Sequence, residues 1–142
     1  MARYSLANRT TNTTTANANT ELRTASADRV SLAEVHAFLS AATASIFGIG
    51  RPAAIGVTPT SPITWLAEDS GSPAGSAQTA LAWGTGPTVP ANFFRRIGLP
   101  ATIGAGFVLV FPLGLIIAVS ASIVLWNLST TAASDVNVIG DE

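Results

Sequence analysis

The sequence contains no cysteine and no lysine, and it has few charges of either sign. Without cysteine the chain forms no disulfide, carries no thiolate nucleophile and has no sulfur ligand for a metal. Charged residues make up 11% of the chain and hydrophobic residues 48%, whereas a typical globular domain is roughly 25% charged. A surface with so little charge is either unusually neutral or partly covered by another molecule.

Patterns of catalytic and metal-binding residues are also missing from the sequence. His36 is the sole histidine, and a metal site needs several converging ligands, so we predict a hydrogen-bonded structural residue. Glu68 and Asp69 are adjacent and would point to opposite faces of a strand, so we predict a solvated loop tip there. The sequence therefore predicts a protein that is not an enzyme, with no catalytic residue, no metal and no cofactor.

The charge balance also argues against two classes of partner. A net charge of −1 gives no positive field that would attract nucleic acid or anionic lipid. Residues 1–20 lack the apolar segment of a signal peptide, so we expect no secretion. Partners recognised by nucleic-acid or membrane-surface chemistry are therefore not expected.

The N-terminal part of the chain is polar and low in complexity. Residues 8–20 read "NRTTNTTTANANT" and show no apolar periodicity. We predict an extended polar arm over residues 1–25, followed by one β-domain over residues 26–142. The arm would become ordered through backbone hydrogen bonds to a neighbouring subunit.

In the rest of the chain, turn-forming residues are spaced as in an all-β protein. From residue 51 onward, prolines separate short apolar runs such as "ITWLAE" and "FVLVF", which favours a single-domain antiparallel β-sandwich. Residues 31–40 are ambiguous, because Ser31 and Glu34 form a capping-box pattern while the apolar residues also alternate. We favour a strand there, and we predict a surface loop over residues 67–78.

Residues 107–126 form a run of twenty residues without a charge, about the length of a membrane-spanning helix. Pro112 and Gly114 interrupt this run, and it is rich in β-branched residues. We therefore predict four strands, over residues 106–111, 115–119, 122–129 and 135–140. The alternative is a holin-like or tail-anchored membrane protein that spans the bilayer over about residues 107–128, with Arg95 and Arg96 on the inner side.

Two aromatic-rich segments carry the remaining expectations. In "SIVLWNLS", residues 122–129, both faces of the predicted strand are apolar, so we expect a partner to cover its outer face and Trp126 to lie in the core. The segment "NFFRRIG", residues 92–98, has three interpretations: a site where bases stack, an intersubunit clamp, or an ordinary strand with one arginine at the edge.

Three stretches resemble small structural proteins encoded in tailed-phage genomes: "IGRPAAIGVTPTSPITWLAED", "ALAWGTGPTVPANFFRRIGLPATIGAG" and "SIVLWNLSTTAASDVNVIGDE". The resemblance covers residues 46–142 and the "MARYSLA" start. Such proteins are similar to jelly-roll cement or decoration proteins of phage heads. The resemblance implies a jelly-roll-like sandwich on the outer surface of the virion head, where it clamps neighbouring major capsid protein subunits.

The resemblance also implies a homo-oligomer, for which we favour a homodimer over a homotrimer, and no nucleic-acid or membrane partner. Another virion component of the same fold, at the head–tail junction, in the tail or at the base of a head fibre, is the main alternative. Arginines and aromatics are the residue types that anchor interfaces. The candidate interface residues are Arg3, Tyr4, Arg9, Trp65, Phe93, Phe94, Arg95 and Arg96.

Overall fold

The structure is a computed structural model that describes residues 2–10, 17–24 and 28–142. These residues contain β-strands and no helix, which confirms the all-β prediction. One sheet has five strands: β1 (Arg3–Thr10), β3 (Val30–Leu39), β7 (Leu66–Ala67), β11 (Gly106–Ile117) and β13 (Ser134–Asp141). A second has six: β2 (Asn17–Arg23), β4 (Ser45–Gly50), β6 (Ile63–Thr64), β8 (Gln78–Ala80), β10 (Arg95–Leu99) and β12 (Ser122–Asn127). A separate pair is formed by β5 (Val57–Pro59) and β9 (Trp83–Thr85).

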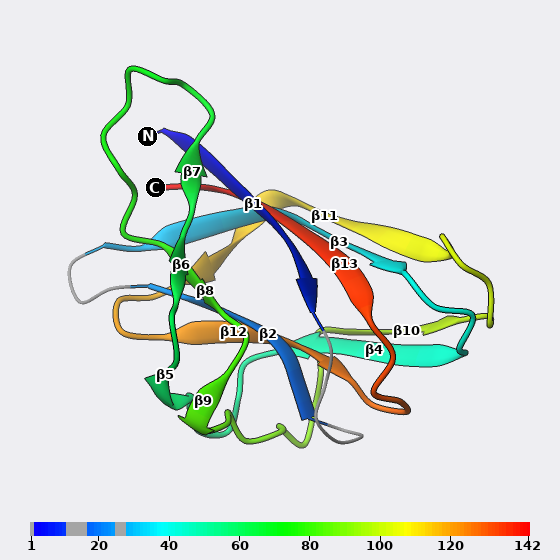
Figure 1. The fold of residues 1–142 in the computed structure, drawn as a ribbon. Helices are drawn as coiled ribbons and strands as arrows, with labels where there is room; N and C mark the ends of the chain where they lie inside the picture. The colour runs from blue at the N-terminus through cyan, green and yellow to red at the C-terminus, as the bar shows by residue number, and fades with distance from the viewer. Residues whose placement is uncertain (1, 11–16, 25–27) are drawn as a thin grey trace.

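The two sheets form an antiparallel sandwich with jelly-roll connectivity (Figure 1). The strand orders are β11-β3-β13-β1-β7 and β10-β4-β12-β2-β8-β6. Strands from opposite ends of the chain pair with one another, β1 with β13 and β2 with β12, and then β3 with β11 and β4 with β10. A ribbon folded in this way wraps into two Greek keys, which is the jelly-roll arrangement. The predicted jelly-roll-like sandwich is confirmed.

The core lies between the two sheets and follows from the alternation of side chains along each strand. In β13, Val136 and Val138 are buried, while Asn137 and Ile139 between and beyond them are more exposed. β3 shows the same alternation, so the strand that we favoured over residues 31–40 is confirmed and the capping-box helix is not formed. The largest fully buried side chains of the core include Leu22, Leu32, Leu39, Phe47, Ile49, Trp65, Ile117, Ile123 and Leu125.

The predicted N-terminal arm is corrected by the structure. The described parts of residues 1–25 are strands of the domain, with β1 paired to β13 over its full length and β2 paired between β12 and β8. Tyr4 and Leu22 bury their side chains in the core. The polar residues of these strands obtain their backbone hydrogen bonds from the C-terminal strands of the same chain, so they need no neighbouring subunit. The middle of the low-complexity stretch, residues 11–16, lies outside the described residues.

The charge-free segment folds into fewer strands than predicted. Residues 106–111 and 115–119 were expected as separate strands, but one strand, β11, runs from Gly106 to Ile117, and residues 118 and 119 lie beyond its end. Its pairing with β3 shifts between Val110 and Leu115. Gly114 has a φ of 71° at this shift, a conformation that glycine adopts without steric cost. The alternative of a helical span over residues 107–128 is wrong, because these residues form β11 and β12. No helix that is long and apolar enough to cross a membrane occurs in the described part of the chain.

Candidate interaction surfaces

The outer face of the six-stranded sheet is covered by the chain itself. Val124 and Trp126 of β12 point away from the main core and are fully buried in a second cluster. Trp83 of β9 and Phe93 pack over them, and the rings of Phe93 and Trp126 meet edge to face with centroids 5.6 Å apart. The chain between β4 and β10, residues 51–94, is called the excursion, and its parts around β5 and β9 supply this cover below the lower sheet in Figure 1. The prediction that a partner covers the outer face of β12 is therefore wrong, whereas the core position of Trp126 is confirmed.

A buried carboxyl group attaches the excursion to the sheet. Glu21 of β2 has no exposed surface. Its Oε1 accepts hydrogen bonds from the backbone N–H of Gly56, at 3.1 Å, and from the Ser122 hydroxyl, at 2.7 Å. Its Oε2 accepts from the Arg23 guanidinium at 3.2 Å and from the indole N–H of Trp83 at 2.5 Å. Two sheet strands and two parts of the excursion thus converge on one buried acid, which compensates for its desolvation.

The outer face of the five-stranded sheet is not covered in this way, since no described strand packs on it (Figure 1). The register of the sheet places its outward side chains in rows across β11, β3, β13 and β1. We call this surface the open face and define it by two such rows. They are Val108, His36, Asn137 and Ala7, and Val110, Glu34, Ile139 and Ser5.

The open face is most apolar along β11, the edge strand of the sheet. Val108 and Val110 are 52% and 57% exposed, and Leu113 at the register shift is 97% exposed. Edge strands of monomeric proteins usually carry charges that prevent pairing with other chains. β11 has no charged residue. Pro112 and the bulge beside it interrupt this edge.

The rest of the open face carries paired charges. Arg9 binds Asp135 through two hydrogen bonds of 2.7 and 3.0 Å, and Arg3 binds Asp141 in the same way. The hydrogen bonds that Arg9 donates to the Asp135 carboxylate lower the pKa of Asp135 and raise the pKa of Arg9. Beside these pairs lies a shallow depression of about 300 Å³, whose lining includes His36. These charges satisfy one another, so they favour a neutral partner surface over a charged one.

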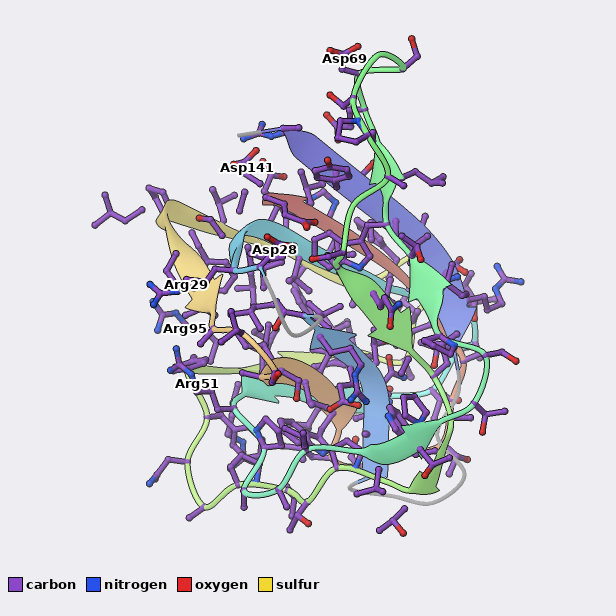
Figure 2. The ribbon with its side chains drawn as sticks, turned by 90° about the vertical axis from the view of Figure 1, so that its left-hand side faces the viewer. Asp28, Arg29, Arg51, Asp69, Arg95 and Asp141 are labelled. Carbon is purple, nitrogen blue, oxygen red and sulfur yellow. The ribbon has the colours of Figure 1, made fainter. Side chains whose placement is uncertain are left out.

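Three arginines collect on the side of the molecule where β10 and β11 end the two sheets. The guanidinium groups of Arg29, Arg51 and Arg95 lie along one side of the molecule (Figure 2). Arg51 donates to the carbonyl oxygen of Ile116 in β11, at 3.2 Å, and its Cζ lies 5.1 Å from the centre of the Phe94 ring. It thereby bridges the two sheets. None of the three arginines forms a salt bridge with a described residue.

The structure places the predicted interface residues on three different parts of the molecule. Tyr4 and Trp65 are 4% and 2% exposed in the core, so they are not available to a partner, in contrast to the prediction. Their polar atoms are satisfied internally, because the Tyr4 hydroxyl donates to the Pro73 carbonyl and the Trp65 indole donates to Thr79. Arg3 and Arg9 are exposed on β1, in the five-stranded sheet.

The remaining candidates belong to the segment "NFFRRIG", which is an edge strand with its approach. Arg95 and Arg96 are exposed on β10, the last strand of the six-stranded sheet. Phe93 packs on Trp126, and Phe94 lies under Arg51. The interpretation as a strand is confirmed, although both arginines are exposed where one was expected at the edge. The two phenylalanines pack within the domain. The arginines of β1 and those of β10 do not converge on one site.

The structure also locates the polar residues considered for chemistry. Nε2 of His36 lies 2.9 Å from Oε2 of Glu34, which confirms a hydrogen-bonded histidine on the open face. Glu68 and Asp69 are exposed in the loop between β7 and β8, as predicted. Within residues 2–10, 17–24 and 28–142, no three histidine, aspartate or glutamate side chains are grouped as a metal site would require.

The chain matches no protein-family model, no curated protein and no solved structure.

Sequence reasoning missed the residues that distinguish the two outer faces. Glu21 was assigned to the arm. A single acidic residue in a polar segment does not indicate burial, because its hydrogen-bond partners are distant in the sequence. Val108 and Val110 were expected in a strand, but nothing local indicated which side of that strand would be left open. Arg29 and Arg51 are 22 positions apart in sequence, and only the pairing of the sheets brings them to one side.

Proposed function

We propose that this protein is a structural component of a phage virion, bound to the outside of the head, where it contacts neighbouring major capsid protein subunits. It would stabilise the shell against the pressure of the packaged DNA. The observation that carries this proposal is the open face, an uncovered sheet face bordered by an apolar edge strand with Val108, Val110 and Leu113 largely exposed.

The contrast between the two outer faces supports an interaction role. Where the chain can cover an apolar sheet face with its own excursion it does so, at Val124 and Trp126. Apolar residues that stay exposed on a rigid sheet are typical of interaction sites. A stable interface buries on the order of 800 Å² per partner. Four neighbouring strands of seven or more residues provide a surface of that kind, because a sandwich holds its side chains in fixed positions.

Binding of this kind stabilises a shell by mass action. A protein that binds the assembled shell and not its separated subunits shifts the equilibrium toward the shell, and the effect is multiplied by the number of copies. No chemical step is required. The proposal thus agrees with the absence of catalytic patterns in the sequence, and it agrees with the resemblance to cement proteins.

The test is to count this protein in purified virions of the phage whose genome encodes it, and to compare those virions with particles in which the gene is deleted. We expect hundreds of copies per particle, and we expect particles without the protein to release DNA at lower temperature and on osmotic shock. About six or twelve copies would indicate a neck, tail or fibre-base component instead. Its absence from virions, or unchanged resistance of the deleted particles, would overturn the proposal.

A further inference from the structure

We propose that the protein associates head to tail, with the arginines of one copy binding the acidic loop of the next. The basic edge consists of Arg29, Arg51 and Arg95, at the side of the molecule where β10 and β11 end the two sheets. The acidic loop is residues 68–77, with Glu68 and Asp69 at its start. This contact does not depend on binding to a phage head, so the two proposals can fail separately.

The basic edge retains most of its hydrogen-bonding capacity. Arg29 is exposed and forms no hydrogen bond with a described residue, and Arg95 donates only to the carbonyl oxygen of its neighbour Phe94, at 2.7 Å. Arg51 uses one nitrogen for the Ile116 carbonyl. Each guanidinium has five N–H donors in a planar fork that suits a carboxylate. Asp28 is exposed beside Arg29 but forms no salt bridge with it.

The acidic loop offers the complementary groups on a fixed base. The loop is held to the domain by the Tyr4 hydroxyl on the Pro73 carbonyl, at 3.1 Å, and by the Ser76 N–H on the Glu142 carboxylate, at 2.8 Å. Glu68 and Asp69 are exposed and form no salt bridge with a described residue. A loop that is already ordered loses less entropy on binding than a mobile one.

The positions of the two sites explain why a second copy is needed. Strand β7, from which the acidic loop leaves, and strand β11 are the opposite edges of the five-stranded sheet. Asp69 is accordingly well separated from the three arginines in Figure 2. Asp135 and Asp141 are already paired with Arg9 and Arg3 within the chain. Asp28, next to Arg29, is one carboxylate against three arginines, so the basic edge keeps a net positive charge. The basic edge can therefore meet Glu68 and Asp69 only between molecules.

Apolar residues accompany the charges at both sites. Leu66, which precedes the acidic loop, is 67% exposed, and Leu113 and Ile116 of β11 are 97% and 43% exposed. Burial of these side chains would supply affinity, while the charges would determine orientation. Two different surfaces meet, so the contact is heterologous. If the rotation that relates neighbouring copies returns to the first copy, repetition of this contact forms a closed ring.

The test is sedimentation velocity of the full chain over a range of concentrations and salt. We expect reversible association that weakens several-fold between about 50 and about 500 mM NaCl, because exposed charges are screened. The double variant Arg29→Glu/Arg95→Glu should associate at least about 10-fold more weakly than the unaltered protein. The double variant Glu68→Arg/Asp69→Arg should show a similar loss. An equimolar mixture of the two double variants should recover association, because each supplies the charge that the other needs.

Arg96→Glu is the matched control, since Arg96 lies on the same strand as Arg95 but its guanidinium is directed over the Phe93 ring, with Cζ 5.8 Å from the ring centre. It should associate like the unaltered protein. The variants at Arg29 and Arg95 remove no hydrogen bond to another strand, so thermal unfolding should show that they fold. A monomer at all concentrations in low salt, equal association of all variants, or failure of the mixture to recover it would each overturn the proposal.

Discussion

The two outer faces of this sandwich both have apolar residues along a strand, but these residues are buried on one face and exposed on the other. On the six-stranded sheet, Val124 and Trp126 are fully buried beneath the chain's own excursion. On the five-stranded sheet, Val108 and Val110 remain more than half exposed at the edge. Apolar character on the outer side of a strand thus does not by itself indicate a partner, because a distant part of the same chain can provide the cover.

The largest expected effect on stability comes from removing the carboxyl group of Glu21, which holds the excursion to the six-stranded sheet. Glu21→Ala would leave the donors of Ser122, Trp83 and the Gly56 backbone without their buried acceptor. We expect the free energy of unfolding to fall by about 3–5 kcal/mol, measured by urea denaturation. Glu34→Ala on the open face is the control, with a change within about 0.5 kcal/mol. A loss of less than about 1 kcal/mol for Glu21→Ala would show that the cover is held by apolar packing alone.

A smaller effect should follow from pushing the cover away from the sheet. A Cβ added to Gly56 would meet the Trp83 indole and the Glu21 carboxyl, whereas a Cβ added to Gly98 meets nothing within 4 Å. Gly56→Ala should therefore destabilise by about 1–3 kcal/mol, measured by thermal unfolding. Gly98→Ala should be neutral or slightly stabilising, because alanine loses less backbone entropy. Equal effects of the two substitutions would contradict close packing at Gly56.

Substitutions on the open face should affect binding and leave stability almost unchanged. Val110→Lys places a charge on an exposed position of the edge strand and should change the free energy of unfolding by no more than about 0.5 kcal/mol. We expect it to weaken binding to shells that lack the protein by about 10-fold or more, measured by co-sedimentation. Ile55→Lys, on the excursion and 42% exposed, is the control. Equal binding by both variants would place the contact elsewhere.

The smallest effect concerns the charge pairs of the open face. Arg9 lowers the pKa of Asp135, mainly through hydrogen bonds to the carboxylate. The stabilisation is therefore fully present above the ordinary pKa of aspartate, about 3.9, and is lost as the pH falls through the lowered value in the folded state. NMR titration of Asp135 should show its pKa rising toward the ordinary value in Arg9→Gln. An unchanged pKa would mean that the pair does not persist in solution.

Much of the fold could be predicted from local patterns. Alternation of apolar and polar residues indicated the strand over residues 31–40, and Pro112 and Gly114 argued against a helix in the charge-free segment. The N-terminal arm was wrong for a physical reason. Strands β1 and β2 are polar and gain their order by pairing with β13 and β12, more than 90 residues away in sequence. Backbone hydrogen bonds of this kind leave no local signature.

The sequence by itself determined the class of protein: short strands with turns between them, few charges and a chain without cysteine. The tertiary structure alone decided which apolar faces are covered. "FVLVF" and "IVLW" are similar as sequences, and each can form a strand with apolar side chains on both sides. Trp83 and Phe93 lie over β12 and leave β11 open because the parts of the chain that carry them, around β9 and just before β10, run along the outside of the six-stranded sheet. The path of the chain, which no local pattern encodes, therefore determines where the protein can meet a partner.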